Sequence, residues 1–194
     1  GLDGSGKGEM LTKLQTYLQE KGYNVFVTQE PSESVYGKQI RKQLQEDTDP
    51  EKDAEKLLNL YIKDREEHLK KEIIPFLQNH QKAIVLCDRY YYATIAYQSI
   101  QGIPVEEIIQ KNQHFKQPDL ALILNVNPDV ALERINKARN QTEKFEQLEF
   151  MQKLQKRFLE LKELLQDNII IIDANKQIDE VFTQLTEEVN KLIN

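Results

Sequence analysis

Short apolar runs alternate with helical patterns along this chain, and this alternation limits the folds it can adopt more than any other feature. Strand-like runs of apolar, β-branched or aromatic residues cover residues 23–28, 83–87, 120–126 and 169–172. Apolar residues recur at helical spacing in the other stretches, which are residues 10–18, about 51–79, 89–101, 104–113, 128–139, 145–166 and 177–193. The alternation predicts the α/β class, with a parallel sheet, right-handed crossovers and helices on both faces.

A glycine-rich loop opens the chain, directly before the first helical pattern. The first eight residues read G-L-D-G-S-G-K-G, and three of the 7 glycines fall within the first six positions. Up to its last position this follows the P-loop pattern G-x-x-x-x-G-K-[ST], whose backbone N–H groups hold phosphates at a helix N-terminus. The loop predicts an ATP site made by Gly1, Leu2, Asp3, Gly4, Ser5, Gly6, Lys7, Gly8 and Glu9. A flexible glycine turn is the alternative.

The length of the chain predicts a single domain that covers residues 1–194. A P-loop normally follows a buried strand, and the sequence has no residues before Gly1. We therefore expect the first strand of the P-loop-type sheet, about five or six residues long, to be missing before residue 1. Without that strand, its neighbours would have unpaired edges.

Composition excludes some classes of partner. The net charge of −6 argues against duplex nucleic acid or an anionic membrane as the main partner. The longest apolar stretches, such as residues 169–172, are far too short to span a bilayer. The single cysteine, Cys87, excludes an internal disulfide and fits a reducing cytoplasm.

An aspartate and an arginine follow the strand predicted at residues 83–87. Asp88 and Arg89 would stand at the carboxyl end of this strand, where parallel α/β folds bind their ligands. An aspartate there can hold Mg²⁺ or its water, and an arginine can bind a phosphoryl group during transfer. The alternative is an aspartate that caps the next helix beside a surface arginine.

Residues 88–98, D-R-Y-Y-Y-A-T-I-A-Y-Q, resemble the D-R-Y-x-x-S-x-x-A-Y-Q segment of thymidylate kinases. Further segments resemble that family in the same order along the chain. They are T-Q-E-P at 28–31, Y-I-K-D-R-E-E-H at 61–68 with I-P-F-L at 74–77, P-D-L at 118–120 with Pro128, K-F-E at 144–146 and I-D-A at 172–174. The resemblance covers essentially the whole chain.

The resemblance implies an ATP- and Mg²⁺-dependent kinase that phosphorylates dTMP to dTDP. Lys7 would neutralise charge on the transferred phosphoryl group. Arg89 and Arg41 would bind the acceptor phosphate. Asp3 would contact the 3′-hydroxyl of the acceptor sugar and metal-bound water. Asp88 would belong to the metal site, in which ATP and waters would supply most of the ligands.

The same resemblance assigns the pocket for the base and the sugar. Tyr61 and Arg65 lie four residues apart, on one helix face, and would be the platform for thymine and a donor to its O4. Thr94 would bond the N3 edge of the base, and Tyr97 would exclude a ribose 2′-hydroxyl. Gln98 shares their face of the helix. A core aromatic residue and an exposed arginine are the alternative at positions 61 and 65.

A short polar stretch, residues 136–144, resembles the lid of these kinases. Lys137, Arg139 and Lys144 supply its cations, and the P-loop contains no arginine. The family divides by whether a catalytic arginine sits in the P-loop or in the lid, so Arg139 and Lys144 are the expected catalytic cations. A solvated charged turn is the alternative.

Two departures from the family pattern leave other functions open. Gly8 and Glu9 replace the hydroxyl residues that would hold Mg²⁺, and Gln29 replaces the arginine of T-R-E-P. The alternatives are therefore a kinase for another nucleoside monophosphate and a catalytically silent nucleotide-binding module.

By resemblance we also expect a homodimer. For His68 we expect a hydrogen-bonding role on its helix.

Overall fold

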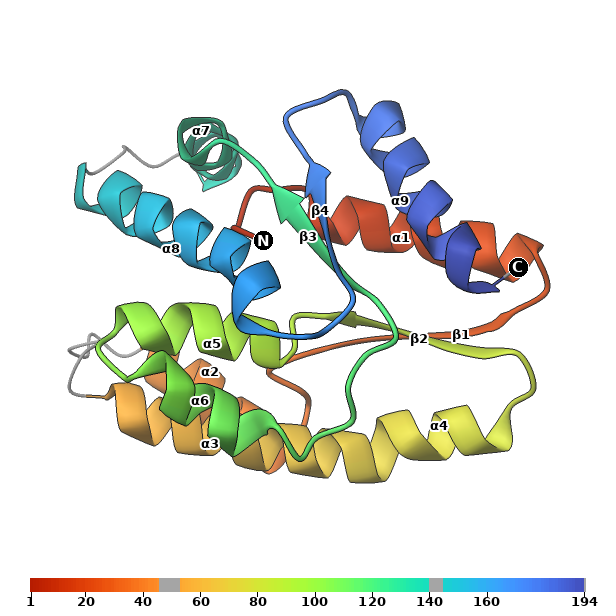
Figure 1. Cartoon of the computed structure of the whole chain (residues 1–194), viewed down its shortest axis with the longest axis horizontal. Coiled ribbons are helices and arrows are strands. Elements are labelled where there is room, and N and C mark those ends of the chain that lie inside the picture. The colour runs from red at the N-terminus through yellow and green to blue at the C-terminus, as the bar shows by residue number, and fades with distance from the viewer. Residues whose placement is uncertain (46–52, 140–144, 194) are drawn as a thin grey trace. The chain divides into compact units, whose positions relative to one another are not determined.

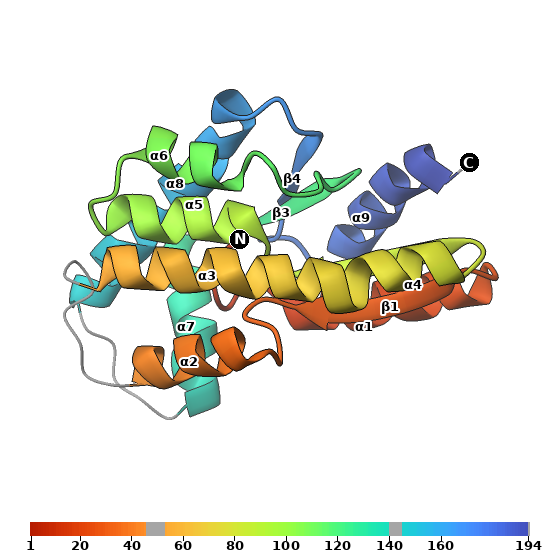
Figure 2. The same ribbon diagram turned by 90° about the horizontal axis from the view of Figure 1, so that it is seen from below.

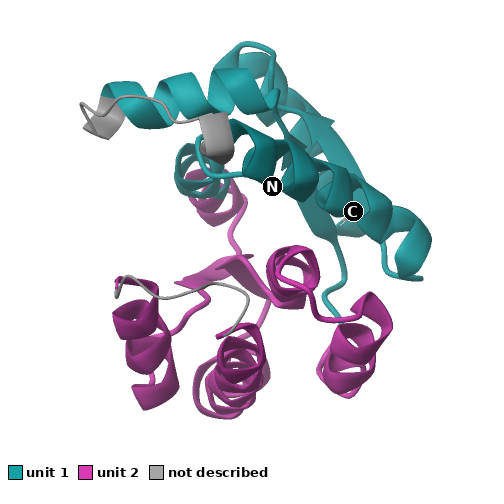
Figure 3. Cartoon of the chain, turned by 90° about the vertical axis from the view of Figure 1, so that its left-hand side faces the viewer, with its two compact units in different colours: residues 1–14, 117–194 teal, residues 15–116 magenta. Residues whose placement is uncertain are grey.

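The computed structural model describes residues 1–45, 53–139 and 145–193; the side chains at 138–139 and 145–147 lie outside this description. The chain forms two compact units. Unit 1 contains Gly1–Leu14 and Gln117–Asn194, and unit 2 contains Gln15–Lys116 (Figure 3). Helix α1, Lys7–Glu20, begins in unit 1 and ends in unit 2. The single domain expected from the length stays a prediction.

Unit 1 is built on a parallel pair of strands. Strand β3, Ala121–Asn125, pairs with β4, Ile169–Asp173, in a register that joins Ala121 to Ile169. The strands lie between α8, Phe145–Leu164, and α9, Ile178–Ile193 (Figure 1). Helix α7, Pro128–Arg139, follows β3. The apolar core comes from both strands and both flanking helices, with Ile123, Leu124, Leu154, Leu161, Ile169, Ile172, Val181 and Leu185 buried.

Unit 2 contains the second parallel pair and a layer of helices. Strand β1, Asn24–Gln29, pairs with β2, Ala83–Asp88, so that the two strands end together at Gln29 and Asp88. The remaining elements are α2 (Val35–Gln45), α3 (Ala54–His68), η1 (Leu69–Ile73), α4 (Ile74–Asn79), α5 (Tyr91–Ile100) and α6 (Val105–Asn112). Helix α4 packs on the sheet through Phe76, whose ring lies 5.2 Å from that of Phe26.

One π-helical turn joins α3 to α4, and the three segments follow one another in a line (Figure 2). In this turn the N–H of Ile74 donates to the carbonyl of Leu69. Pro75 has no N–H, and its ring would clash with the carbonyl four residues earlier in a regular helix. The wider turn accommodates the proline without breaking the helix.

The observed elements confirm the predicted α/β class, and their bounds fall close to the predicted ones. Helix α7 has the predicted bounds. The four strands of the described residues pair two by two, within separate units. One detail differs from expectation. Every residue of β2 is half-buried rather than covered on both faces, since a two-stranded sheet offers few neighbours. None of the described helices is long and apolar enough to cross a membrane.

Candidate active site

The glycine-rich loop of unit 1 has the backbone conformation that its sequence requires. Gly4 and Gly6 have φ angles of 77° and 88°, in the left-handed region that favours glycine. A Cβ on Gly4 would clash with the carbonyl of Ala131 in α7, so the loop rests directly on that helix. A Cβ on Gly6 or Gly8 would meet nothing within 4 Å. The loop is therefore packed on one side and open beside these two glycines.

The lysine of the loop lies over the loop backbone. Lys7 Nζ donates to the carbonyl of Leu2 at 2.8 Å and lies 3.4 Å from Asp3 Oδ1. Arg134 of α7 donates to the carbonyl of Gly4 at 3.3 Å. Helix α1 begins at Lys7, so its N-terminus and the ammonium group stand at the same loop. This arrangement fits a chain of phosphates.

The loop offers less to a metal ion than to phosphate. At position 8 a hydroxyl is absent, and the carbonyl of Gly8 accepts a hydrogen bond from Thr12 Oγ1 at 3.0 Å. The described residues contain no group of three or more His, Cys, Asp or Glu side chains that could hold a metal ion.

In unit 2, the strand ends bring Glu30, Asp88 and Arg89 together. The N–H of Glu30 donates to the carbonyl of Asp88 at 3.0 Å. Arg89 has a φ of 67°, which is unusual for a residue with a side chain and costs on the order of 1–3 kcal/mol. Its guanidinium carbon lies 5.2 Å from the centre of the Tyr97 ring. Strained conformations of this kind cluster at functional sites.

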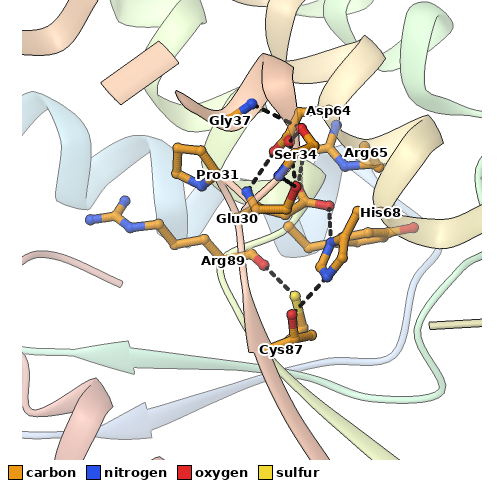
Figure 4. A network of polar contacts seen from close by, with 12 residues as sticks. Glu30, Pro31, Ser34, Gly37, Asp64, Arg65, His68, Cys87 and Arg89 are labelled. Carbon is orange, nitrogen blue, oxygen red and sulfur yellow. Dashed lines mark hydrogen bonds and ion pairs between the residues drawn. The ribbon is translucent and has the colours of Figure 1, made fainter. Parts of the chain in front are cut away.

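A thiol supports the strained residue. Cys87 Sγ donates to the carbonyl of Arg89 at 3.0 Å (Figure 4). Burial raises the pKa of this thiol well above its usual value, and the nearby carboxylate of Glu30 raises it further. Cys87 therefore stays protonated, which keeps its donor in place.

Arg65 is the centre of a fully buried polar network (Figure 4). Its Nη2 donates to Glu30 Oε2 at 2.5 Å and to Thr94 Oγ1 at 3.0 Å, and its Nη1 donates to Asn112 Oδ1 at 2.5 Å. Its guanidinium carbon lies 4.9 Å from the centre of the Tyr90 ring. Its Nε is buried without a partner among the described residues. The network thus holds the Arg65 guanidinium in one orientation.

Two further residues extend this network behind Glu30. His68 Nδ1 lies 3.4 Å from Glu30 Oε1, and His68 Nε2 lies 2.7 Å from Thr28 Oγ1. The hydrogen bonds of His68 therefore reach β1 and the loop after it, beyond the helix on which we expected its role. Both His68 and Glu30 are buried.

The loop after β1 is held by a second buried carboxylate. Asp64 Oδ1 accepts from Ser32 Oγ at 2.5 Å and from Ser34 Oγ at 2.6 Å, and Asp64 Oδ2 accepts from the N–H of Ser32 at 2.8 Å. Ser34 Oγ in turn accepts from the N–H of Gly37 at 3.0 Å. A Cβ on Gly37 would clash with the carbonyl of Ser32, so α2 starts hard against this loop.

Arg41 lies on the same loop. Its Nη1 donates to the carbonyl of Pro31 at 2.9 Å, and its Nη2 lies 3.1 Å from Glu33 Oε1. The Glu33 side chain is 75% exposed, so this ion pair is weak and can be replaced by another anion. Arg41 is thus available to a phosphate that displaces Glu33.

The remaining predicted pocket residues lie on α3 and α5. Burial raises the pKa of Tyr61 to about 12, although the positive charge of Arg89 opposes this rise. The Tyr61 phenol is therefore neutral near pH 7. Gln98 Nε2 donates to Gln101 Oε1 at 3.1 Å, whereas Gln98 Oε1 is buried without a partner in the described part of the chain.

The predicted lid is only partly described. Residues 136–139 form the last turn of α7 rather than a loop, and residues 140–144 lie outside the described residues. Lys137 is exposed and pairs with Glu133, whose pKa it lowers. The Arg139 side chain and Lys144 also lie outside the described residues. The lid and its cations stay predictions.

The predicted site residues are divided between the two units. Unit 1 contains residues 1–9, and unit 2 contains Arg41, Tyr61, Arg65, Asp88, Arg89, Thr94, Tyr97 and Gln98. Of the partners of Arg65, sequence reasoning named Thr94 and missed Glu30 and Asn112. Glu30 had a signal, because it belongs to the T-Q-E-P segment. Asn112 had none, because a polar residue at the end of a helix is usually exposed.

Comparison with known proteins gives a consistent result. The profile of the thymidylate kinase family matches residues 1–185. A probable thymidylate kinase of Archaeoglobus fulgidus is 39% identical over 194 residues, which cover 100% of this chain and 91% of that protein. A probable thymidylate kinase of Staphylothermus marinus is 35% identical over 182 residues, 94% of this chain and 87% of that protein. A thymidylate kinase of Geobacillus sp. is 36% identical over 189 residues, with coverage of 94% and 89%.

Proposed function

Because the chain belongs to the thymidylate kinase family, we propose that it transfers the γ-phosphoryl group of ATP to dTMP, which gives dTDP and ADP. The observation that carries the choice of base is the Arg65 guanidinium. It is fully buried, fixed by three hydrogen bonds, and has a buried Nε without a partner among the described residues.

Arg65 would read the carbonyl at C4 of the pyrimidine. A guanidinium carries five N–H donors and no acceptor, and three of these donors are used by Glu30, Thr94 and Asn112. A carbonyl oxygen can accept from the donors that are left. The C4 amine of cytosine would instead place donor against donor, which leaves buried polar groups unpaired. Tyr61, neutral and half-buried, would offer its ring to the base.

The sugar and the acceptor phosphate would be held by residues of α5 and α2. Tyr97, whose ring lies beside the Arg89 guanidinium, would occupy the space that a 2′-hydroxyl needs. Arg89 would bind the acceptor phosphate during transfer, joined by Arg41 once the phosphate replaces Glu33. Gln98 and Thr94 would line the same helix face.

The P-loop would bind the phosphates of ATP through its backbone N–H groups and Lys7. Lys7 would leave the carbonyl of Leu2 and neutralise the negative charge of the outer phosphates. Bound Mg²⁺ would supply further neutralisation of that charge. Asp88 would orient waters of the metal. Asp3 would contact the 3′-hydroxyl of the sugar, and the lid cations Arg139 and Lys144 would close over the phosphates.

Two further expectations complete the proposal. By family resemblance the enzyme would act as a homodimer. A cytoplasmic location is expected from the single cysteine, Cys87, which fits a reducing compartment.

The direct test is ADP release with ATP, Mg²⁺ and a panel of monophosphates: dTMP, dUMP, UMP, dCMP and CMP. We expect the highest kcat/KM for dTMP and lower values for dUMP, UMP, dCMP and CMP. A higher kcat/KM for CMP or UMP than for dTMP would show that the preferred substrate is another monophosphate. ATP binding without ADP release on any acceptor would identify a silent nucleotide-binding module.

A further inference from the structure

We infer that Glu30, held in place by His68 and Thr28, is a positioning residue that aims the donors of Arg65 and so sets the preference for a C4 carbonyl over a C4 amine. The inference rests on the proposed function and adds residues to which no role in base selection has so far been given. It follows from the chain of contacts Thr28–His68–Glu30–Arg65, of which Figure 4 labels His68, Glu30 and Arg65.

The direction of each hydrogen bond in this chain follows from chemistry. Arg65 can only donate, so Glu30 Oε2 accepts from Nη2 at 2.5 Å. The carboxylate of Glu30 can only accept, so the 3.4 Å contact at Oε1 requires the proton of His68 on Nδ1. In the neutral imidazole Nε2 then accepts, and the hydroxyl of Thr28 donates to it at 2.7 Å. One tautomer of His68 therefore satisfies every member.

Glu30 is the only charged partner of Arg65 within the described residues. The other two acceptors, Thr94 Oγ1 and Asn112 Oδ1, are neutral. Aromatic rings flank the guanidinium, with the centres of Tyr90 and Phe115 at 4.9 and 5.6 Å from its central carbon. The side chains of Arg65 and Glu30 are 0% and 2% exposed, so water does not screen their attraction. Charge-assisted hydrogen bonds are roughly twice as strong as neutral ones, so Glu30 dominates the orientation of the fork.

The π-helical turn places His68 at the end of α3, directly before η1. His68 follows Arg65 by three residues, so both side chains lie on the same helix face and reach the two oxygens of one carboxylate. The weak link is the long contact from His68 Nδ1 to Glu30 Oε1. Changes at His68 should therefore affect base selection less than changes at Glu30.

The experiment compares variants at these positions by steady-state kinetics. KM and kcat are measured for dTMP and ATP, and inhibition constants against dTMP are measured for dUMP and dCMP. Glu30→Gln keeps the shape and removes the charge. It should raise KM for dTMP and the inhibition constant of dUMP by the same factor, about tenfold, with little change for dCMP or in KM for ATP.

Two substitutions of His68 separate its contacts. In His68→Asn the amide lies near the place of Nδ1 and can still donate to Glu30, whereas in His68→Gln it reaches the place of Nε2 and keeps only Thr28. We expect His68→Gln to reduce the discrimination between dUMP and dCMP by a few-fold and His68→Asn to retain it. If circular dichroism shows that Glu30→Gln does not fold, the comparison of His68→Gln with His68→Asn tests the inference without it.

Asp64→Asn is the matched control. Asp64 is a buried carboxylate on the same helix, it bonds Ser32 and Ser34, and it forms no hydrogen bond or ion pair with Arg65 among the described residues. It should lower stability and leave the ratio of the dUMP and dCMP constants unchanged. The inference is overturned if Glu30→Gln and His68→Gln leave that ratio unchanged, or if all the variants lower it equally. A wild-type enzyme that does not phosphorylate dTMP would refute the proposed function instead.

Discussion

Breaking the Arg65–Glu30 pair from either side should destabilise the protein strongly, whereas removing both charges together should cost no more than removing one. The two side chains are 0% and 2% exposed and their charged atoms are 2.5 Å apart. Loss of one partner leaves an uncompensated buried charge, which costs about 3–5 kcal/mol. Arg65→Met and Glu30→Gln are the two single changes, because each keeps the approximate volume of the side chain.

The measurement is a double-mutant cycle on the free energy of unfolding, determined with urea. If each charge contributed independently, the double variant would lose about 6–10 kcal/mol, which is twice the cost of a single buried charge. We expect it to lose no more than the about 3–5 kcal/mol of one single change, because neither charge is then left unpaired. The exposed pair of Lys13 and Asp179, at 3.0 Å, is the control and should show little coupling. Additive losses at Arg65 and Glu30 would show that the two charges do not stabilise each other.

Three further changes test separate parts of the site. Arg89→Ala should lower kcat more than it raises KM for dTMP, because the negative charge that Arg89 faces develops during phosphoryl transfer. A raised KM for dTMP with an unchanged kcat would contradict this role. Gly8→Ser should lower the Mg²⁺ concentration for half-maximal rate, whereas Gly8→Ala should not, since open space surrounds that position and only the serine adds a ligand. Tyr97→Ala should raise the use of TMP, the ribonucleotide, relative to dTMP; an unchanged ratio of kcat/KM would place the 2′-selection elsewhere.

The fold was predictable where local patterns decide it. The helical repeat of 128–139 and the apolar run of 169–172 gave the bounds of α7 and nearly those of β4. The π turn was not predictable, because a proline such as Pro75 can be accommodated by a break, a kink or a wider turn. Strand pairing was also beyond the pattern, since periodicity specifies faces and not neighbours.

The site was predictable in its residues and less so in its geometry. The motifs identified Arg65 and Arg89, but the partners of Arg65 come from 35 and 47 residues away in the sequence, at Glu30 and Asn112. Contacts over such separations depend on tertiary packing, and no regular spacing in the sequence indicates them. The left-handed backbone conformation of Arg89 likewise has no sequence signal, because glycine is the residue type that indicates such a conformation.

The binding of dTMP to an Arg65 variant shows whether this guanidinium recognises the base. Arg65→Met is made in the Glu30→Gln background, where no buried charge is left unpaired, and dTMP and ATP affinities are measured by calorimetry against Glu30→Gln alone. We expect dTMP to bind about 10- to 100-fold more weakly while ATP affinity changes little, because only the base loses a charged donor. Equal affinities for dTMP in the two proteins would contradict it.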